Sequence, residues 1–210
     1  VSQGVWITTT YRNDSKQVRK GSVDDYWKPS GKKGTFAGVR WIDAVDPADR
    51  CGYAVGWLNS TKILSGLRKT PSQLTLKPGE TATFTRYIAV GTSPAAAVSE
   101  VFTVAQTKTG TIAATLADAK TSNPINTATI NIIHQGESVP AYTIAKGKLV
   151  LQLPVDSYAA SIVDRGRKTV MCHVKVNDEK AASINEVLSP LSGVAFDITD
   201  AAGKDTPCKV

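Results

Sequence analysis

The chain holds two histidines, His134 and His173, and both lie inside strand-like runs of alternating residues. A catalytic zinc site or a two-metal site recruits several histidine and carboxylate ligands, usually from separate strand ends. Neighbouring residues of a strand point to opposite faces, so Cys172 and His173 are not placed to act as a nucleophile and its base. The sequence therefore predicts no catalytic residue, no metal site and no cofactor.

Three acidic residues share one loop, where Asp43, Asp46 and Asp49 occur within the segment WIDAVDPADRC. Carboxylate oxygens at such spacing could collect a calcium ion. The loop lacks the glycine and the distal bidentate glutamate of an EF-hand, so turn-forming and strand-capping roles are the favoured interpretation.

The three cysteines, Cys51, Cys172 and Cys208, have none of the close pair spacing that structural zinc sites use. One hypothesis is a single disulfide with one free thiol, and Cys172 with Cys208 is then the expected pair, because both lie in the C-terminal half. The alternative is that all three thiols are reduced.

Aromatic side chains are the most informative feature of the N-terminal half, which holds all four tryptophans. Trp27, Trp41 and Trp57, together with Tyr26, lie near glycine or proline loops and polar residues. Flat rings in such loops could bind a sugar or a partner protein, and these four residues are the candidate binding site. The competing interpretation, which we favour, is that the large rings fill the core of a wide sandwich.

The formal net charge is +7, but lysine and arginine are spread along the chain and interrupted by acids. The densest basic group, Lys28, Lys32 and Lys33, lies in a proline- and glycine-rich loop without the interleaved aromatics of a nucleic-acid surface. We therefore expect a solvated basic surface and no nucleic-acid partner. The alternative is attraction to an acidic polysaccharide, an anionic cell surface or nucleic acid.

The composition, with 41% hydrophobic and 20% charged residues over 210 positions, is that of a folded protein. No run approaches the roughly 18 consecutive apolar residues of a membrane-spanning helix, so no membrane span is expected. The first residues lack a basic segment followed by an apolar one. We therefore expect an extracytoplasmic protein, periplasmic or secreted, whose export signal has been removed.

Alternation of β-branched and polar residues predicts short strands at 52–58, 72–91, 126–136 and 148–164. Pro78 and Gly79 suit the centre of a type II turn, which predicts a hairpin over 76–90. One helix is expected over 93–104, because a serine can cap it and Pro94 fits its first position. The chain is thus predicted to be all-β with one short helix.

The polar segment QTKTG divides the strand pattern, and two tandem β-sandwich-like units are expected on either side of it. The first unit, 1–107, holds the tryptophans, and the second, 111–189, is built from valine, isoleucine, leucine and threonine. A third piece, 193–210, is expected to form a C-terminal hairpin. Its last strand stops at Val210 without a turn, as a truncated fragment would.

Strand signatures of a known sandwich family recur in the second unit. The matching positions are Gly110, Ile112 and Asp118 in an opening strand, Pro124, Ala128, Ile130 and Ile132 in a second, and Leu151, Leu153, Pro154 and Tyr158 in a third. This pattern resembles the carboxypeptidase regulatory-like, or prealbumin-like, seven-stranded β-sandwich. Asp156 stands where that family usually has glycine, and aspartate can also take the left-handed turn conformation at modest cost.

A longer stretch carries a second resemblance, through LKPGETATFTRYIAVGTSPAAAVSEVF at 76–102 and the ending VAFDITDAAGKDTPCKV. Residues 72–210 resemble the region upstream of the catalytic domain in CehA/McbA-type PHP metallohydrolases. Residues 1–70 are more weakly similar to the late strands of a supersandwich domain of the galactose-mutarotase type. The metal-binding constellation of the metallohydrolases follows this region, so the resemblance implies architecture and assigns no catalytic residue.

These resemblances imply a noncatalytic scaffold or accessory portion of an exported bacterial metal-dependent hydrolase, partnered by the catalytic domain of the same parent protein. A rival hypothesis is a carbohydrate- or cell-surface-binding module that uses the aromatic residues of the first unit. A third is a structural adhesin repeat, which an intramolecular isopeptide link would support.

Overall fold

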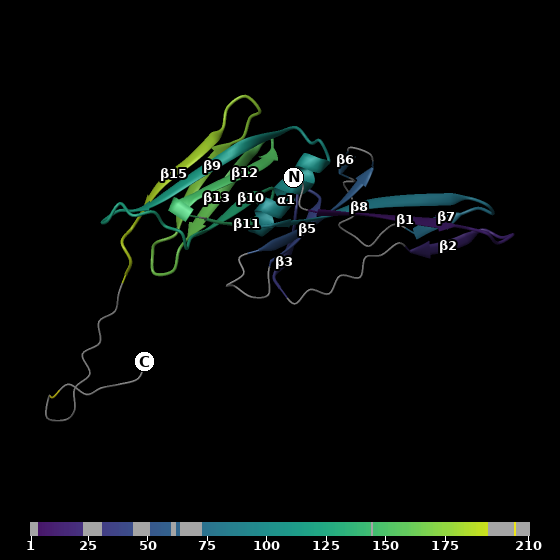
Figure 1. Cartoon of the computed structure of the whole chain (residues 1–210), viewed down its shortest axis with the longest axis horizontal. Coiled ribbons are helices and arrows are strands. Elements are labelled where there is room, and N and C mark those ends of the chain that lie inside the picture. The colour runs from purple at the N-terminus through teal and green to yellow at the C-terminus, as the bar shows by residue number, and fades with distance from the viewer. Residues whose placement is uncertain are drawn as a thin grey trace.

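The computed structural model describes residues 4–22, 31–43, 51–59, 62–63, 73–143, 145–192 and 204. These residues form strands β1 to β15, helix α1 and a single 3-10 turn at Ala145–Gly147 (Figure 1). The prediction of an all-β chain with one short helix is confirmed. The expected C-terminal hairpin over 193–210 lies outside the described residues, except for Lys204.

A six-stranded antiparallel sheet dominates the first unit, in the order β1-β8-β5-β4-β3 with β6 paired to β5. Its strands are β1 (Gly4–Arg12), β3 (Lys33–Phe36), β4 (Val39–Asp43), β5 (Gly52–Asn59), β6 (Lys62–Ile63) and β8 (Thr81–Gly91). Alternate residues share a face of a strand, so this sheet places Phe36, Trp41 and Tyr87 on its inner face. All three are buried. The predicted strand at 52–58 is confirmed by β5.

Helix α1 (Pro94–Val104) covers the inner face of this sheet. Ser93 has extended backbone and caps the helix, because its side-chain oxygen accepts the N–H of Ala96 at 3.2 Å. Pro94 occupies the first helical position, where no N–H is needed. The helix predicted over 93–104 is therefore confirmed, and Gln106, with φ of +51°, follows it.

Seven strands in two sheets form a β-sandwich that follows the helix. One sheet has the order β12-β9-β15 and the other β11-β10-β13-β14. The strands are β9 (Thr109–Asp118), β10 (Thr129–His134), β11 (Glu137–Tyr142), β12 (Lys148–Pro154), β13 (Ser157–Val163), β14 (Val170–Lys175) and β15 (Ala182–Leu188). β15 runs parallel to β9, while the other pairs are antiparallel.

Period-two alternation explains how this sandwich buries its interior. Along β9 the residues Gly110, Ile112, Ala114 and Leu116 are buried, and the residues between them are more exposed. β12 and β13 alternate in the same way. Strands with one apolar face must cover that face, and two such sheets satisfy each other by packing together. The seven-stranded sandwich expected from the family resemblance is present.

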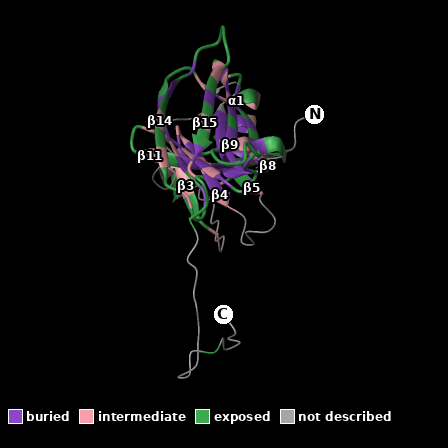
Figure 2. Ribbon diagram, turned by 90° about the vertical axis from the view of Figure 1, so that its left-hand side faces the viewer, coloured by how far each residue is buried: buried purple, intermediate pink, exposed green. Residues whose placement is uncertain are grey.

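A single hydrophobic core runs through both units. Helix α1 contacts β4, β5 and β8 on one side and β11 and β12 of the sandwich on the other. Buried residues gather between these layers, while the outer surfaces are largely exposed (Figure 2). In the described residues, the inner face of the six-stranded sheet is covered by the helix and the sandwich, not by a second sheet of its own. The boundary expected at 106–110 covers the connection after α1 and the first two residues of β9, and it stays a prediction.

The turn at Pro78-Gly79 exists, but the hairpin predicted over 76–90 is wrong. The N–H of Glu80 donates to the carbonyl of Lys77 at 3.0 Å, and Gly79 has φ of +77°, as a type II turn requires. The flanking strands do not pair with each other. β7 (Gln73–Leu76) pairs with β2 (Arg19–Ser22), and β8 pairs with β1 and β5.

Asn13 explains why β7 and β8 pair with other strands and not with each other. Its main-chain and side-chain hydrogen bonds join the chain reversal after β1 to the turn between β7 and β8. Its backbone N–H donates to the carbonyl of Glu80 at 3.0 Å, and its carbonyl accepts the N–H of Gly79 at 2.7 Å. Its side-chain amide donates to the carbonyls of Gln17 and Leu76 at 2.8 and 2.9 Å. Long-range bonds to this buried asparagine thus direct each strand toward a partner that is distant in the sequence.

Candidate functional site

The aromatic residues predicted to bind a ligand have separate locations. Tyr26 and Trp27 lie outside the described residues. Trp41 and Trp57 are each 7% exposed, and their strand register places them on opposite faces of the six-stranded sheet. The Arg86 guanidinium lies 5.3 Å from the centre of the Trp57 ring. Trp41 thus belongs to the buried core, whereas Trp57 is buried on the opposite face of the sheet, and the binding role of the group stays a prediction.

Among the three described tryptophans, the most exposed is one outside the candidate binding group. Trp6, on β1, is 52% exposed, and its ring centre lies 5.1 Å from that of Tyr87. No local sequence signal distinguishes it, because β1 becomes an edge strand only through its pairing with β8.

The junction between the six-stranded sheet and the sandwich is the most elaborate contact surface among the described residues. It begins at the tight turn between β3 and β4, where Ala37 and Gly38 have φ of +46° and +84°. Two successive positive values are typical of the two-residue hairpin turn that matches strand twist. The backbone N–H of Ala37 donates to Oε2 of Glu137, on β11, at 2.8 Å. The turn is therefore fixed against the sandwich.

Trp41 is the second contact of this junction. Its indole Nε1 donates to the backbone carbonyl of Ser138, also on β11, at 3.1 Å. Gly34, opposite Trp41 on β3, makes room for the ring, since a Cβ there would lie 2.5 Å from Cζ2 of the indole. A third polar contact joins the Tyr142 hydroxyl of the sandwich to the Asp43 carboxylate of β4.

An aromatic group forms the apolar part of the junction. Phe36, on β3, is fully buried and stacks on Tyr158 of β13 with ring centres 6.2 Å apart and planes 19° apart. The His134 ring lies 5.0 Å from that of Tyr158 and 6.2 Å from that of Phe36. Rings at such separations contribute beyond their buried area. His134 therefore has a packing role in this group.

Asp156 supports this group through its carboxylate. Its φ is not positive, so it does not use the left-handed conformation that aspartate can adopt in place of glycine. Its carboxylate instead accepts the N–H of Ser157 at 2.7 Å and contacts Nε2 of His134 at 2.9 Å. The Ser157 N–H and then His134 hold the pKa of Asp156 below its ordinary value. Burial raises the pKa of Tyr158, and the nearby Asp156 carboxylate raises it further.

Two open hollows lie near this junction. The first, of about 580 Å³, is lined by Lys32, Lys33, Gly34, Thr35, Trp41, Gly136, Glu137 and Ser138. The second, of about 440 Å³, lies over β10, β13 and β14 and includes His134 and His173. The first hollow combines an indole with basic, acidic and hydroxyl groups, which is chemistry that could hold a sugar.

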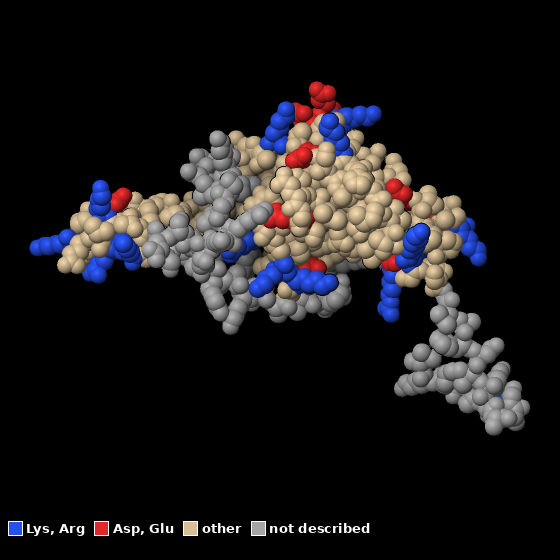
Figure 3. All heavy atoms as spheres, turned by 180° about the vertical axis from the view of Figure 1, so that it is seen from behind, with Lys and Arg blue, Asp and Glu red and all other residues tan. Residues whose placement is uncertain are grey.

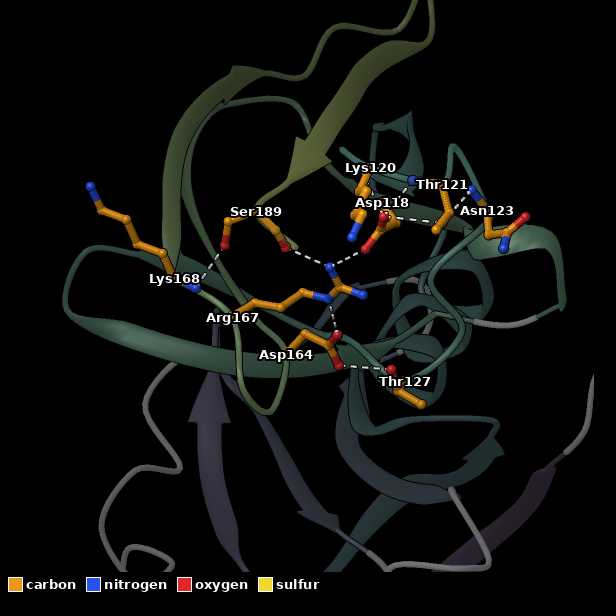
Figure 4. Close-up of polar contacts among 9 residues, drawn as sticks. All are labelled: Asp118, Lys120, Thr121, Asn123, Thr127, Asp164, Arg167, Lys168 and Ser189. Carbon is orange, nitrogen blue, oxygen red and sulfur yellow. Dashed lines mark hydrogen bonds and ion pairs between the residues drawn. The ribbon is translucent and has the colours of Figure 1, made fainter. Parts of the chain in front are cut away.

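A buried ionic network closes the far end of the sandwich, and no motif of the sequence predicts it. Arg167 donates from Nε to the Asp164 carboxylate at 2.8 Å, and from its NH1 group to the Asp118 carboxylate and the Ser189 carbonyl (Figure 4). The three charged side chains are 5 to 10% exposed. Thr127 completes the group by donating to Asp164 at 2.7 Å.

Asp118 also orders the loop that follows β9. Its Oδ1 accepts the N–H of Lys120 at 2.9 Å and the N–H of Thr121 at 2.7 Å. The Arg167 guanidinium, followed by the Thr121 N–H, holds the pKa of Asp118 well below its ordinary value. The network joins the ends of β9, β13 and β15, so its role is to fix the fold.

No group of three or more histidine, cysteine or acidic residues with metal-binding geometry occurs among the described residues. Asp46 and Asp49, of the possible calcium loop, lie outside them. Cys51 and Cys172 are both half-buried, and burial, with the Glu186 charge, raises the pKa of Cys172. Cys208 is outside the described residues, so the pair Cys172–Cys208 stays a prediction.

Two further properties bear on the function classes considered. The buried polar side chains of the described residues are Asn13, Ser93, Ser99, Asp118, Thr143 and Asp164. This part of the chain thus offers no buried lysine for an intramolecular isopeptide link. No described helix has the length and apolar character needed to cross a membrane.

No protein-family model and no curated protein matches the chain. Among solved structures, the Bacillus anthracis TIE protein aligns with 90% of this chain and 34% of its own, at 11% identity and a TM-score of 0.36. A shaft pilin SpaA variant from Lactobacillus rhamnosus GG aligns over 93% of this chain and 100% of its own, at 12% identity and a TM-score of 0.34. The group B streptococcus pilus 2b backbone protein aligns with 90% of this chain and 94% of its own, at 10% identity and a TM-score of 0.32.

This chain therefore spans about a third of the TIE protein. Likenesses with TM-scores this low carry no inference about the function of the chain, which must come from its own residues.

Proposed function

We propose that this chain is a noncatalytic scaffold portion of an exported bacterial metal-dependent hydrolase, and that it holds the catalytic domain of its parent protein in a fixed position. The observation that carries the proposal is the junction, where the six-stranded sheet, α1 and the sandwich share one core. Two units joined only by a flexible linker would move independently. Units that share a core move as one body.

Polar contacts support the same conclusion. The bonds from Ala37 to Glu137, from Trp41 to Ser138 and from Tyr142 to Asp43 each cross the junction. Each needs a specific relative placement of the two units, because a hydrogen bond weakens steeply when its distance or angle departs from the preferred range. The apolar core resists separation, and these bonds resist sliding.

The scaffold role predicts a narrow distribution of distances between the two units. Spin labels on Val90→Cys, in the first unit, and Lys168→Cys, in the sandwich, measure it by pulsed electron resonance, with the three native cysteines replaced by serine. The control pair is Lys148→Cys with Lys168→Cys, both within the sandwich. We expect similar widths for the two pairs. A cross-junction distribution that is much broader, or has two maxima, rules out a rigid scaffold.

The hydrolase part of the proposal rests on the resemblance of residues 72–210 to the region upstream of a PHP catalytic domain. The gene sequence beyond Val210 tests it directly. A following domain with the histidine- and aspartate-rich metal constellation supports the proposal. A reading frame that stops at Val210, or continues into an unrelated domain, contradicts the hydrolase assignment and leaves the rigidity result unaffected.

A second candidate function is carbohydrate binding at the hollow lined by Trp41, Lys32 and Lys33. Occupation of this hollow by a sugar would change the surroundings of the indole, so saturable quenching of tryptophan fluorescence by a neutral polysaccharide is expected. Trp41→Phe, which keeps an aromatic ring, should weaken the quenching, and Trp6→Phe is the matched control. Unchanged fluorescence across a polysaccharide panel contradicts this function.

A further inference from the structure

A two-stranded arm extends from the six-stranded sheet. β5 pairs with β8 only from Thr85 to Gly91, whereas β1 continues to pair with β8 down to Thr81. Beyond that point the chain continues into the β2–β7 pair. Residues 9–22 and 73–84 thus form an arm that projects from the body (Figure 1). The bonds of Asn13 hold its two chain reversals together.

The arm is strongly basic. It contains five basic residues and two acidic ones. The basic residues are Arg12, Lys16, Arg19, Lys20 and Lys77, all exposed, and Figure 3 shows lysine and arginine side chains around the end of the projection. Like charges on so small an element repel one another, so they lower stability unless an anion neutralises them.

The two acids of the arm are already engaged. Asp14 pairs with Nε of Arg12 at 2.8 Å, and the Glu80 carboxylate accepts the backbone N–H of Lys77 at 2.7 Å. Arg19 donates to the Ser15 hydroxyl at 3.2 Å. The ammonium groups of Lys16, Lys20 and Lys77 have no ion-pair partner among the described residues. These three groups are available to an external anion.

The chemistry of the arm favours one class of anion. The aromatic residues of the arm, Tyr11 and Phe84, contact each other edge to face and are half-buried, so they offer no stacking platform of the kind that nucleic acids use. Val18 is its one described large apolar residue more than half exposed, which is too little for insertion into a lipid surface. Lysine ammonium groups are point charges without the planar fork that selects a single phosphate. Several separate ammonium groups can each contact one anionic group of a polymer in which such groups repeat at regular intervals.

We propose that this arm binds a linear anionic polysaccharide through Lys16, Lys20 and Lys77. Binding releases the counterions that such a polymer attracts, so its affinity falls as salt concentration rises. The arm lies outside the junction, and this activity is independent of the scaffold role.

Affinity for polygalacturonate, a linear polymer of carboxylated sugars, tests the proposal with the full chain. The variant Lys16→Gln/Lys20→Gln/Lys77→Gln removes three charges from the arm, and Lys148→Gln/Lys168→Gln/Lys175→Gln removes three exposed charges from the sandwich. Both variants have the same net charge, and thermal melting checks that both fold. We expect the arm variant to lose about tenfold or more in affinity at low salt and to show a shallower salt dependence, while the sandwich variant stays near the wild type.

Three results would overturn the proposal. Equal losses in the two variants would mean that net charge alone causes the attraction. Binding of the wild type to neutral dextran as strong as to polygalacturonate would mean that charge is not the determinant. Tighter binding to duplex DNA or to anionic phospholipid vesicles than to polygalacturonate would assign the arm a different partner.

Discussion

Replacing Phe36 with alanine should lower the free energy of unfolding by about 3 to 5 kcal/mol, the usual cost of removing a fully buried phenylalanine. The side chain is inaccessible to solvent and stacks on Tyr158 across the junction. The substitution leaves a cavity between β3 and β13, and a close-packed interior relaxes only partly around such a cavity. Denaturant titration measures the loss.

The position of Phe36 between the two units also predicts a change in the cooperativity of unfolding. Because the core is continuous, the wild type should unfold in one cooperative transition, whereas the variant should lose cooperativity between the units. Tryptophan fluorescence follows the first unit, which holds all four tryptophans, and far-ultraviolet circular dichroism follows the whole chain. Phe84→Ala, on the arm, is the control and should leave the two signals coincident. Coincident transitions in Phe36→Ala would show that the coupling between the units does not depend on Phe36, and separate transitions in the wild type would show that the junction does not couple them.

The second large effect is expected for Arg167→Met, which keeps a long side chain and removes the charge. The substitution leaves the buried carboxylates of Asp118 and Asp164 without their shared partner. Breaking a buried ion pair from one side is strongly destabilising, and the melting temperature should fall by on the order of 10 °C. The matched control is Arg12→Met. Its pair with Asp14 is exposed, with side chains 67% and 74% accessible, so the melting temperature should barely change.

The pH dependence separates this ionic mechanism from a loss of packing. Arg167 is the largest cause of the lowered pKa of Asp118. A folded-state pKa below the unfolded value of about 4 gives stability that is fully present above that value and is lost as pH falls through it toward the folded pKa. Arg167→Met removes most of this contribution, so the variant has less of it to lose in acid.

The difference in melting temperature between the wild type and Arg167→Met should therefore narrow as the pH is lowered from 7 toward 3. A difference that stays constant over this range would mean that the guanidinium acts through packing alone.

Much of the local structure could be predicted from the sequence, because it depends on residues close together in the chain. Alternation of apolar and polar residues marks β9, β12 and β13, since a strand exposes successive side chains on opposite faces. A serine followed by a proline sets the start of α1, because the cap and the first helical turn involve only adjacent residues. The turn at Gly79 follows from the same kind of local chemistry.

The candidate sites were harder to predict, because neighbours in space are not neighbours in sequence. Trp41 is of a residue type that often binds ligands, and it lies near a loop in the sequence. Its indole is nevertheless buried and donates to the carbonyl of Ser138, 97 positions later in the chain. Arg167 and Asp118 are 49 positions apart, and nothing in either segment marks them as partners. Asp156 was noted only as a substitute for the family's glycine, and its contact with His134 appears only in the structure.

The sequence by itself thus determined the strand-rich character of the chain, the position of helix α1 and the alternation that gives each strand an apolar face. Only the tertiary structure decided which strands pair, including the separation of β7 from β8 and the parallel pairing of β15 with β9. Secondary structure follows from interactions over a few residues, whereas pairing depends on which apolar faces and backbone groups find partners across the whole chain. The basic arm and the rigid junction both arise at that second level.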